Sequence, residues 1–424
     1  MNLKRVVVTG LGAVTPIGNT VPEFWNNAIA GMSGAAPITN FDTDAIKTKI
    51  KFACEVKGFD LDRYIDRKEA RKMDRYTHYS VASAVQAIED SGLDMEKEDL
   101  ERIGVIIGFG MGGVGSFVEG IETITEQAKR GQELKVTPFF VPRILGSIAA
   151  GQISIMYNLK GPNYTTSSAC ASGTHAIIDA VNMLRLGRAD VIVTGGAEAA
   201  VCACGICGFG VMHALSTRND SPATASRPMS ASRDGFVMGE GGGVLILEEY
   251  EHAKARGAKI YAEVAGWGAT ADAYHMTAPE PEGNGAMRVM REALADAKLE
   301  PADIDYINMH GTSTPLGDIV ECKAIKDLFG DEAYRINLSS TKSMTGHLLA
   351  GAGAIEAIAT VLAVHNDIIP PTINHEEGDD DPEIDYRMNF TFNKAQRRTV
   401  RAALSNTFGF GGHNSCIIFK KFKD

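Results

Sequence analysis

One cysteine in this chain lies where its thiol could take part in chemistry. Cys170 follows a short, polar, β-prone stretch that begins after Gly161-Pro162, and it precedes Ser172 to Leu186, whose apolar residues recur at helical spacing. The pattern predicts a strand-to-helix turn with the thiol near a helix N-terminus, where unpaired amide groups favour a thiolate. Small neighbouring residues would let a substrate carbonyl approach the sulfur. The alternative is a buried cysteine that packs as a small apolar residue, which is the commoner role.

Two histidines share this setting. His310 and His347 each follow a predicted strand, Ile304 to Met309 and Ile336 to Ser340, and each lies in a turn rich in glycine and threonine. A cysteine with one histidine would indicate papain-like acyl transfer. Two histidines indicate a different task, in which an imidazole donates a hydrogen bond to a substrate oxygen while a thioester carbon reacts. The chain has ten histidines, so a purely structural role is the alternative for each.

The elements that must position these residues alternate strand and helix along the whole chain, and polar residues follow the strand ends in both halves. This pattern is typical of a layered α/β architecture with a site between the halves. A junction at Gly257-Ala-Lys divides the chain into residues 1–256, which carry the cysteine, and residues 257–424, which carry both histidines. No short repeat is visible.

The composition is that of a globular enzyme, with 424 residues, 44% of them hydrophobic and 22% charged. A net charge of −11 argues against nucleic acid or an anionic membrane as the main partner. No apolar run approaches the length of a membrane span, because Gly, Thr and charged residues interrupt each candidate. Seven cysteines without paired spacing indicate a reducing compartment and no disulfide framework, so we expect a cytoplasmic protein.

Three motifs invite other interpretations. Gly10-Leu-Gly12 follows the first predicted strand, but Thr15 stands where a dinucleotide fingerprint has its third glycine. The glycines of residues 108–115 lack the Lys-Ser/Thr of a phosphate loop and indicate close backbone packing. The three cysteines of residues 202–207 have no second cysteine pair or histidine pair nearby, so we expect them to pack in the core and predict no metal site.

A basic segment opens a long predicted helix that runs from residue 67 to Ser91. Its cations recur at one-, three- and four-residue steps, so that several share one face. They are Arg67, Lys68, Arg71, Lys72 and Arg75. In a chain this acidic the cluster favours docking of an acidic partner, and an ordinary solvated helix face is the alternative.

Longer motifs carry a resemblance to a known family. They include Ser-Ala-Cys-Ala-Ser-Gly around Cys170, His-Gly-Thr-Ser-Thr-Pro from His310, and Lys-Ser-Met-Thr-Gly-His from Lys342 to His347. Others, such as Thr-Gly-Leu-Gly-Ala-Val-Thr-Pro-Ile-Gly, Pro-Phe-Phe-Val-Pro and Phe-Gly-Phe-Gly-Gly, extend it through nearly the whole chain. In these motifs the sequence resembles the condensing enzymes of fatty-acid synthesis, the β-ketoacyl-[acyl-carrier-protein] synthases, and most closely their second class.

The resemblance implies a thiolase-like fold of five layers, α-β-α-β-α, built from two similar halves and working as a homodimer. It implies a decarboxylative Claisen condensation of an acyl group with malonyl-acyl carrier protein, which gives 3-oxoacyl-acyl carrier protein, CO2 and free carrier in fatty-acid elongation. It implies no cofactor and no metal, since phosphopantetheine arrives on the carrier. The expected partners are acyl carrier protein and a second copy of the chain, without nucleic acid or membrane.

The same resemblance implies roles residue by residue. Cys170 would attack the acyl thioester, and the backbone N–H groups of Cys170 and Phe410 would form the oxyanion hole. His310 and His347 would promote decarboxylation and stabilise the enolate. The residues that match groups orienting these histidines are the charged pair Lys342 and Glu321, together with Phe408.

Further matches concern the substrate and the carrier. The pantetheine arm would be held by Thr277, Thr312 and Thr314. Phe410 matches the gate of the acyl pocket, and Met111 lies where the family sets acyl-chain length. Carrier docking is assigned to Arg67, Lys68, Arg71 and Lys72. The chain departs from its relatives at His413, where a threonine is usual, and at Leu134 and His213, where some relatives place arginines for the carrier.

Three related proteins stand as alternatives. The ketosynthase of a type II polyketide system shares the motifs and works as a heterodimer. A catalytically silent chain-length subunit lacks the nucleophile, so Cys170 argues against it. A thiolase uses a second cysteine near the C-terminus as a base, and Cys416 is close to that position but falls in a predicted strand.

Overall fold

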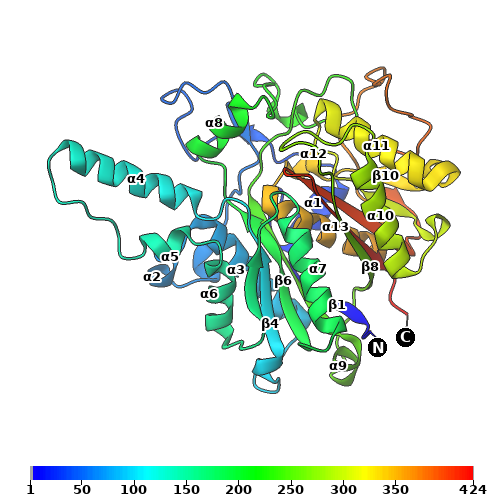
Figure 1. The fold of residues 1–424 in the computed structure, drawn as a ribbon, viewed down its shortest axis with the longest axis horizontal. Helices are drawn as coiled ribbons and strands as arrows, with labels where there is room; N and C mark the ends of the chain where they lie inside the picture. The colour runs from blue at the N-terminus through cyan, green and yellow to red at the C-terminus, as the bar shows by residue number, and fades with distance from the viewer. Residues whose placement is uncertain (1–2, 424) are drawn as a thin grey trace.

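A computed structural model describes residues 3–423, in which layers of helices enclose a large sheet (Figure 1). The ten strands of this sheet have the order β10-β9-β13-β14-β8-β1-β7-β6-β4-β5. The N-terminal half contributes β1 (Val6–Val14), β4 (Ile103–Gly108), β5 (Asn163–Thr166), β6 (Val191–Glu198) and β7 (Gly241–Glu249). The C-terminal half contributes β8 (Ala262–Ala271), β9 (Tyr306–Asn308), β10 (Asn337–Ser339), β13 (Ala402–Gly409) and β14 (His413–Lys420).

The two halves of the sheet repeat one topology. Counted outward from the middle, the orders are β1-β7-β6-β4-β5 and β8-β14-β13-β9-β10, and in each the first two pairings are antiparallel and the next two parallel. A short antiparallel pairing of Val7 with Glu263 and Val8 with Ala262 joins the halves. The repeat confirms the expected fold of two similar halves, although no short repeat marks it in the sequence. The boundary between residues 256 and 257 stays a prediction.

Helices form three layers around the two halves of the sheet (Figure 1). The outer face of the N-terminal strands is covered by α3 (Arg75–Ser91) and α6 (Ile148–Tyr157). The outer face of the C-terminal strands is covered by α10 (Asn284–Ala297) and α11 (Pro315–Phe329). Between the halves lie α7 (Ser172–Arg185) and α13 (Ala352–Asn366), which contact strands of both. This arrangement confirms the five-layered α-β-α-β-α fold.

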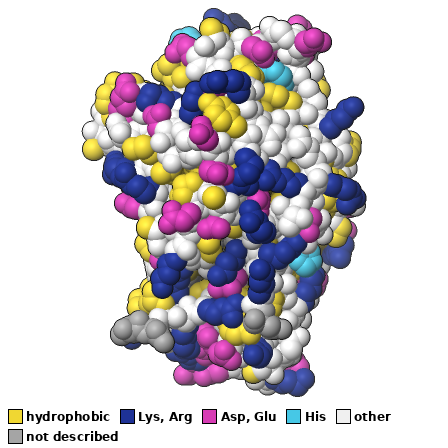
Figure 2. Space-filling view, turned by 90° about the vertical axis from the view of Figure 1, so that its right-hand side faces the viewer, with side chains coloured by type: hydrophobic (Ala, Val, Ile, Leu, Met, Phe, Trp, Pro, Cys, Tyr) yellow, Lys and Arg dark blue, Asp and Glu magenta, His cyan; other side chains and the backbone are white. Residues whose placement is uncertain are grey.

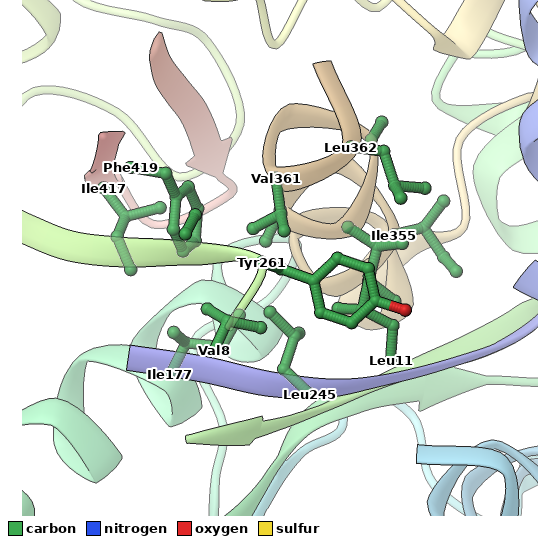
Figure 3. Packing of buried hydrophobic residues seen from close by; sticks show 14 of the residues in the cluster. Val8, Leu11, Ile177, Leu245, Tyr261, Ile355, Val361, Leu362, Ile417 and Phe419 are labelled. Carbon is green, nitrogen blue, oxygen red and sulfur yellow. The ribbon is translucent and has the colours of Figure 1, made fainter. Parts of the chain in front are cut away.

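The two central helices form the middle of the core. Ile355 and Val361 of α13 pack in one cluster with Ile177 of α7 and Leu245 of β7 (Figure 3). Within residues 3–423, one helical stretch, Leu349–Asn366, is long and apolar enough to cross a membrane, and 89% of it is buried inside the protein. Its apolar character follows from its position, because a helix covered on every side must be apolar all round.

The remaining elements lie around these layers. They are α1 (Val21–Ile29), α2 (Arg67–Ala70), α4 (Val114–Lys129), α5 (Phe140–Ile144), α8 (Ala203–Val211), α9 (Tyr250–Ala255), α12 (Lys342–Thr345), β2 (Ala36–Pro37) with β3 (Phe52–Ala53), and β11 (Ile368–Ile369) with β12 (Gln396–Arg397).

The prediction of one continuous basic helix from residue 67 to Ser91 is wrong. The helix α2 ends at Ala70, and α3 starts at Arg75. Asp74 separates them, because one of its oxygens caps α3 through Tyr76 N at 3.2 Å and the other accepts from the Ser116 hydroxyl at 2.6 Å. The capping preference of an aspartate thus outweighs the helical spacing of the cations.

Charge is distributed unevenly over the surface. Figure 2 shows Lys and Arg side chains gathered on the side of the molecule that carries α10 and α11, although the net charge is −11. Several cations of this half are paired, including Arg335 with Glu332 and Lys326 with Asp385. The net charge therefore does not describe each face, and many of these cations serve the local structure.

Glycines of β1 allow α3 to lie directly on the sheet. A β-carbon at Gly12 would be 1.9 Å from Ser83 O, and one at Gly10 would be 2.2 Å from Ala87 O. No side chain fits at such distances, so these glycines serve helix–strand packing. The Gly10-Leu-Gly12 motif needs no dinucleotide to explain it.

We expect Gly12→Ala to lower the free energy of unfolding by about 3 kcal/mol, because the added methyl group must displace the backbone of α3. Guanidinium unfolding measures the change. Gly151→Ala is the control, since its β-carbon meets nothing within 4 Å and alanine is the better helix former. Equal stability of Gly12→Ala and wild type would contradict the close packing.

Candidate active site

Cys170 lies in the turn between β5 and α7, as the sequence predicts, and its side chain is 8% exposed. The turn is strained, because Ala169 has a φ of +52°, which non-glycine residues rarely adopt. Ser172 holds the turn: its hydroxyl donates to Ala169 O at 2.6 Å and accepts from Ser168 N at 2.9 Å. The turn leaves the Cys170 thiol in the wall of a cavity.

His347 reaches Cys170 because the first turns of the two central helices touch. A β-carbon at Gly173 of α7 would lie 2.7 Å from Ala350 O, just before α13. The segment that leads into α13 is thereby placed beside the Cys170 turn, and His347 Nε2 lies 3.0 Å from Cys170 Sγ. The two residues occupy equivalent positions in the repeated topology, each between an outermost strand and a central helix.

His310, at the end of β9, completes the group. Its ring lies 5.3 Å from the His347 ring at an interplanar angle of 86°, and 5.6 Å from the Phe408 ring. Lys342 Nζ is 3.3 Å from His310 Nδ1. An ammonium group only donates, so Nδ1 accepts this bond and the ring proton sits on Nε2. His310 therefore presents an N–H donor from the far side of its ring.

The charged groups around the histidines differ from the expected pair of Lys342 with Glu321. Lys342 forms a buried ion pair with Glu356 of α13. Glu321 accepts from the backbone N–H groups of His310 at 2.9 Å and Gly311 at 2.8 Å. Glu321 therefore holds the backbone of His310, and Glu356 balances the ammonium. Sequence reasoning missed Glu356, although a single acidic residue within an alanine-rich helix was a signal for it.

Both histidines are neutral near pH 7. Burial lowers the pKa of His310 and of His347 well below the usual range, and the Lys342 ammonium lowers both further. A neutral imidazole carries one N–H donor and one acceptor nitrogen. The pair can thus donate hydrogen bonds to a substrate oxygen on which negative charge develops.

The thiol of Cys170 is less acidic than the sequence led us to expect. Burial raises its pKa to about 12, although the Lys342 ammonium and a hydrogen bond from Phe410 N–H lower it. Burial is larger than the effect of the ammonium or of this hydrogen bond, and a helix N-terminus acts in the same lowering direction as those two. Burial therefore favours the neutral thiol in the free enzyme, beside an imidazole whose pKa burial also lowers.

A cavity of about 450 Å³ collects most of the residues that the sequence singled out. They are Cys170, Thr277, His310, Thr312, Thr314, Glu321, His347, Phe408 and Phe410. The hydroxyl oxygens of Thr312 and Thr314 are 2.9 Å apart. Phe209 of α8 also lines the cavity, with its ring 6.2 Å from that of Phe410. Sequence reasoning missed Phe209, because nothing in the α8 sequence shows which residues will lie opposite Phe410.

Met111 is not brought to this cavity. Its side chain is 38% exposed, and its backbone N–H donates to the buried Glu198 carboxylate at 3.0 Å. The single chain therefore does not place Met111 where it could limit the length of an acyl group bound at Cys170.

The predicted docking residues lie on α2 and directly after it. Arg67, Lys68 and Arg71 are exposed, and Lys72 is half-buried. Local acids neutralise part of their charge, since Arg67 pairs with Asp62, and Lys72 pairs with Glu69 at 2.6 Å. The surface nevertheless presents cationic side chains to solvent.

The remaining cysteine motifs lie outside the site, and all seven cysteines are free. Cys204 is exposed while Cys202 and Cys207 are half-buried, so the expectation that this cluster packs in the core is wrong. Across residues 3–423, no group of three or more His, Cys, Asp or Glu side chains could hold a metal ion. Cys416 is completely buried in β14, away from the cavity wall, and is not placed to act as a base.

Comparisons with known proteins place both halves of the chain in one family. Residues 3–253 match the family model described as beta-ketoacyl synthase, N-terminal domain, and residues 261–376 match the corresponding C-terminal domain. Three curated relatives share the description 3-oxoacyl-[acyl-carrier-protein] synthase 2. That of Staphylococcus aureus is 47% identical over 99% of both chains, that of Vibrio cholerae 48% over 99% and 100%, and that of Synechocystis 49% over 99% of both.

Solved structures show the same fold. A type II polyketide ketosynthase in complex with its acyl-carrier protein has a TM-score of 0.90 and 34% identity, with 99% of this chain and 100% of that chain covered. A beta-ketoacyl synthase from Burkholderia phymatum has a TM-score of 0.90 and 36% identity, with the same coverage.

Lys342→Met would leave Glu356 buried without its cation. We expect the free energy of unfolding to fall by about 3–5 kcal/mol, because the buried Glu356 carboxyl, whose pKa burial raises and Lys342 lowers, must then either stay charged without a cation or take up a proton. Guanidinium unfolding of the single variant and of Lys342→Met with Glu356→Leu measures this. The double variant should recover most of the loss, and equal stability of the two variants would contradict a direct pair.

Proposed function

The chain belongs to the β-ketoacyl synthase family and is a condensing acyltransferase, and on this premise we propose that Cys170 carries the growing acyl group while His310 and His347 act on malonyl-acyl carrier protein. The enzyme condenses the two groups, releases CO2 and returns a 3-oxoacyl group on the carrier in fatty-acid elongation. One observation carries the assignment of residues: a thiol and two neutral imidazoles converge in one cavity, with His347 Nε2 3.0 Å from Cys170 Sγ.

The first half-reaction transfers the acyl group to sulfur. Cys170 Sγ attacks the thioester carbon of the acyl carrier, and the C–S bond to the phosphopantetheine breaks. The proton of the Cys170 thiol ends on the departing pantetheine thiol. The N–H groups of Cys170 and Phe410 are the donors for the tetrahedral oxyanion, and Phe410 N–H already donates toward Sγ in the free enzyme.

The second half-reaction needs no group that removes a proton from carbon. Loss of CO2 breaks the C–C bond of the malonyl group and leaves the electron pair as an enolate. The enolate oxygen accepts hydrogen bonds from Nε2–H of His310 and from Nε2–H of His347. His347 Nε2 is free for this task once Cys170 is acylated, because the acylated sulfur has no proton to share with it. The enolate carbon then attacks the Cys170 thioester and its C–S bond breaks, and the Cys170 thiolate that leaves takes up one proton from solvent. Neutral donors suit this step, because the charge they stabilise appears only during the reaction.

The surrounding residues hold His310 and the substrate arm in position. Lys342 keeps the His310 proton on Nε2, Glu321 holds the His310 backbone, and Phe408 packs on its ring. Thr277, Thr312 and Thr314 bind the pantetheine arm along the cavity wall. The chemistry calls for no metal or bound cofactor, since the phosphopantetheine belongs to the substrate.

The substrates arrive on acyl carrier protein. A structural relative is a ketosynthase in complex with its acyl-carrier protein. In this chain the exposed cations Arg67, Lys68 and Arg71, with Lys72, form the docking surface for this acidic partner. A soluble carrier and seven free cysteines support a cytoplasmic location.

A homodimer would cover an otherwise open edge of the fold. The strand β5 is the outermost of its half of the sheet and leads to Cys170. Large apolar side chains are exposed on α6, which packs against β5, on α4, and on or directly after α5, which contacts α4: Phe117 48%, Ile121 42%, Val141 56%, Leu145 46% and Ile155 75%. Pairing of β5 with its copy would satisfy the edge and bury this surface. The same interface would enclose Met111, which would then limit the acyl pocket.

A type II polyketide ketosynthase is the second candidate, since a structure of that class shares the fold at 34% identity and a ketosynthase/chain length factor shares it at 35%. The curated 3-oxoacyl-[acyl-carrier-protein] synthases are closer, at 47–49%. A silent chain-length role does not agree with Cys170 in contact with His347. The oligomeric state separates the fatty-acid enzyme from the polyketide ketosynthase, because we expect the first to form a homodimer and the second a heterodimer.

Intact-protein mass spectrometry tests the nucleophile. Mixing with medium-chain acyl-acyl carrier protein should add one acyl mass to wild type and none to Cys170→Ala, because only the thiol forms the thioester. Malonyl-acyl carrier protein should then remove the adduct and appear as 3-oxoacyl carrier. Wild type that accepts no acyl group of any length would refute the fatty-acid function.

Sedimentation analysis of the purified chain tests the homodimer. We expect twice the chain mass at micromolar concentration, and a shift to the monomer for Val141→Asp, which places a charge in the proposed apolar interface. Leu186→Asp is the control, because Leu186 is also 54% exposed but follows α7 at another surface. A stable wild-type monomer, or association only with a different chain, would overturn the proposal.

A further inference from the structure

The backbone of His347 is held by one segment, Val237 to Gly239. His347 N donates to Val237 O at 2.8 Å, and Gly239 N donates to His347 O at 2.9 Å. Both polar backbone groups of the histidine therefore depend on this segment. A shift of the segment would move the His347 imidazole relative to Cys170 Sγ, which lies 3.0 Å from Nε2.

The segment is paired on its other side with Cys54. Cys54 N donates to Met238 O at 2.8 Å, and Glu240 N donates to Cys54 O at 3.2 Å. Residues 237–240 thus lie between Cys54 on one side and His347 on the other, with backbone hydrogen bonds to both. The last residue of this segment, Glu240, is acidic and buried.

Glu240 ties this segment to α3. Its side chain is 0% exposed. Its Oε1 accepts from Arg75 at 2.5 Å, from the Tyr79 hydroxyl at 3.1 Å and from Val56 N at 3.2 Å. Burial raises the pKa of Glu240, and the Arg75 guanidinium opposes that shift. A carboxylate buried this deeply needs such a partner to stay in place.

Arg75 connects this buried carboxylate to the carrier surface. It is the first residue of α3, a few residues after the docking cations of α2, and its side chain is 42% exposed. Neither Arg75 nor Glu240 lines the cavity. The pair therefore does not line the site of reaction, and the structural connection from it to the site runs through the backbone that holds His347.

We infer that the Arg75–Glu240 ion pair positions His347 for the decarboxylation step and links that histidine to the carrier-docking surface. The inference rests on the proposed function. Arg75 and Glu240 are positioning residues: the pair fixes Val237 to Gly239, the segment fixes the His347 backbone, and the backbone aims Nε2–H at the malonyl thioester oxygen.

Steady-state release of CO2 from malonyl-acyl carrier protein by Arg75→Ala tests this. We expect kcat to fall about tenfold, because a small displacement of a catalytic group lowers the rate steeply. The KM for the carrier and the rate of Cys170 acylation should change by less than about twofold, since neither depends on where Nε2–H points. Arg75→Lys retains a cation and should recover most of kcat.

Two control variants separate positioning from docking. Arg71→Ala removes an exposed cation of the docking surface and should raise the KM for the carrier. Arg291→Ala removes an exposed cation of α10 and should change neither parameter. If Arg75→Ala raises KM without lowering kcat, as a docking residue would, the inference is refuted.

Tyr79→Phe tests the inference even if the charge variants fail to fold. It removes the hydrogen bond that Tyr79 donates to Glu240 and the one that it accepts from Arg75, without changing any charge. We expect a decrease in kcat of about two- to threefold with the melting temperature nearly unchanged. Two results together would assign the ion pair a structural role only. These are a wild-type kcat in Tyr79→Phe, and a parallel fall of kcat, acylation rate and stability in Arg75→Ala. Wild-type enzyme that releases no CO2 at all would instead refute the proposed function.

Discussion

The contact between the first turns of α7 and α13 is the constraint on which the rest of this structure depends. Both helices are enclosed between the halves of the sheet, and a glycine at position 173 allows their starts to touch. Each helix follows the outermost strand of its own half, so the repeated topology delivers one reactive side chain from each half to the same place. Cys170 and His347 meet for this reason, although 177 positions separate them.

Burial then sets the electrostatic character of the site. It removes the positive charge from both imidazoles and the negative charge from the resting thiol. One buried cation remains close by, and Glu356 balances it. The site is therefore almost uncharged until a substrate brings its own thioester and carboxylate. Fixed donors in such a surrounding stabilise a developing enolate more strongly than water would, because they need not reorganise.

Residues around the site illustrate which features local patterns can predict. The turns that carry Cys170, His310 and His347 were recognisable because strand, small residues and helix follow each other directly along the chain. The break between α2 and α3 was missed, because the aspartate that causes it is held by Ser116, far along the sequence. The partner of Lys342 was missed for a different reason: Glu321 and Glu356 are both acidic and both nearby in the sequence, and only the folded chain decides which carboxylate meets the ammonium.

The acidity of the thiol was also misjudged, since a helix N-terminus is visible in a sequence and desolvation is not. By itself the sequence determined the alternation of strands and helices, the family, and the position of the candidate nucleophile and of both candidate histidines in strand-end turns, because periodicity and contiguous motifs are local properties. Tertiary structure alone decided that the halves repeat, which charges pair, that Met111 stays outside the cavity of one chain, and that Glu240 lies between α3 and the His347 segment. These features depend on which distant segments come within a few ångströms of one another, and that proximity is a property of packing.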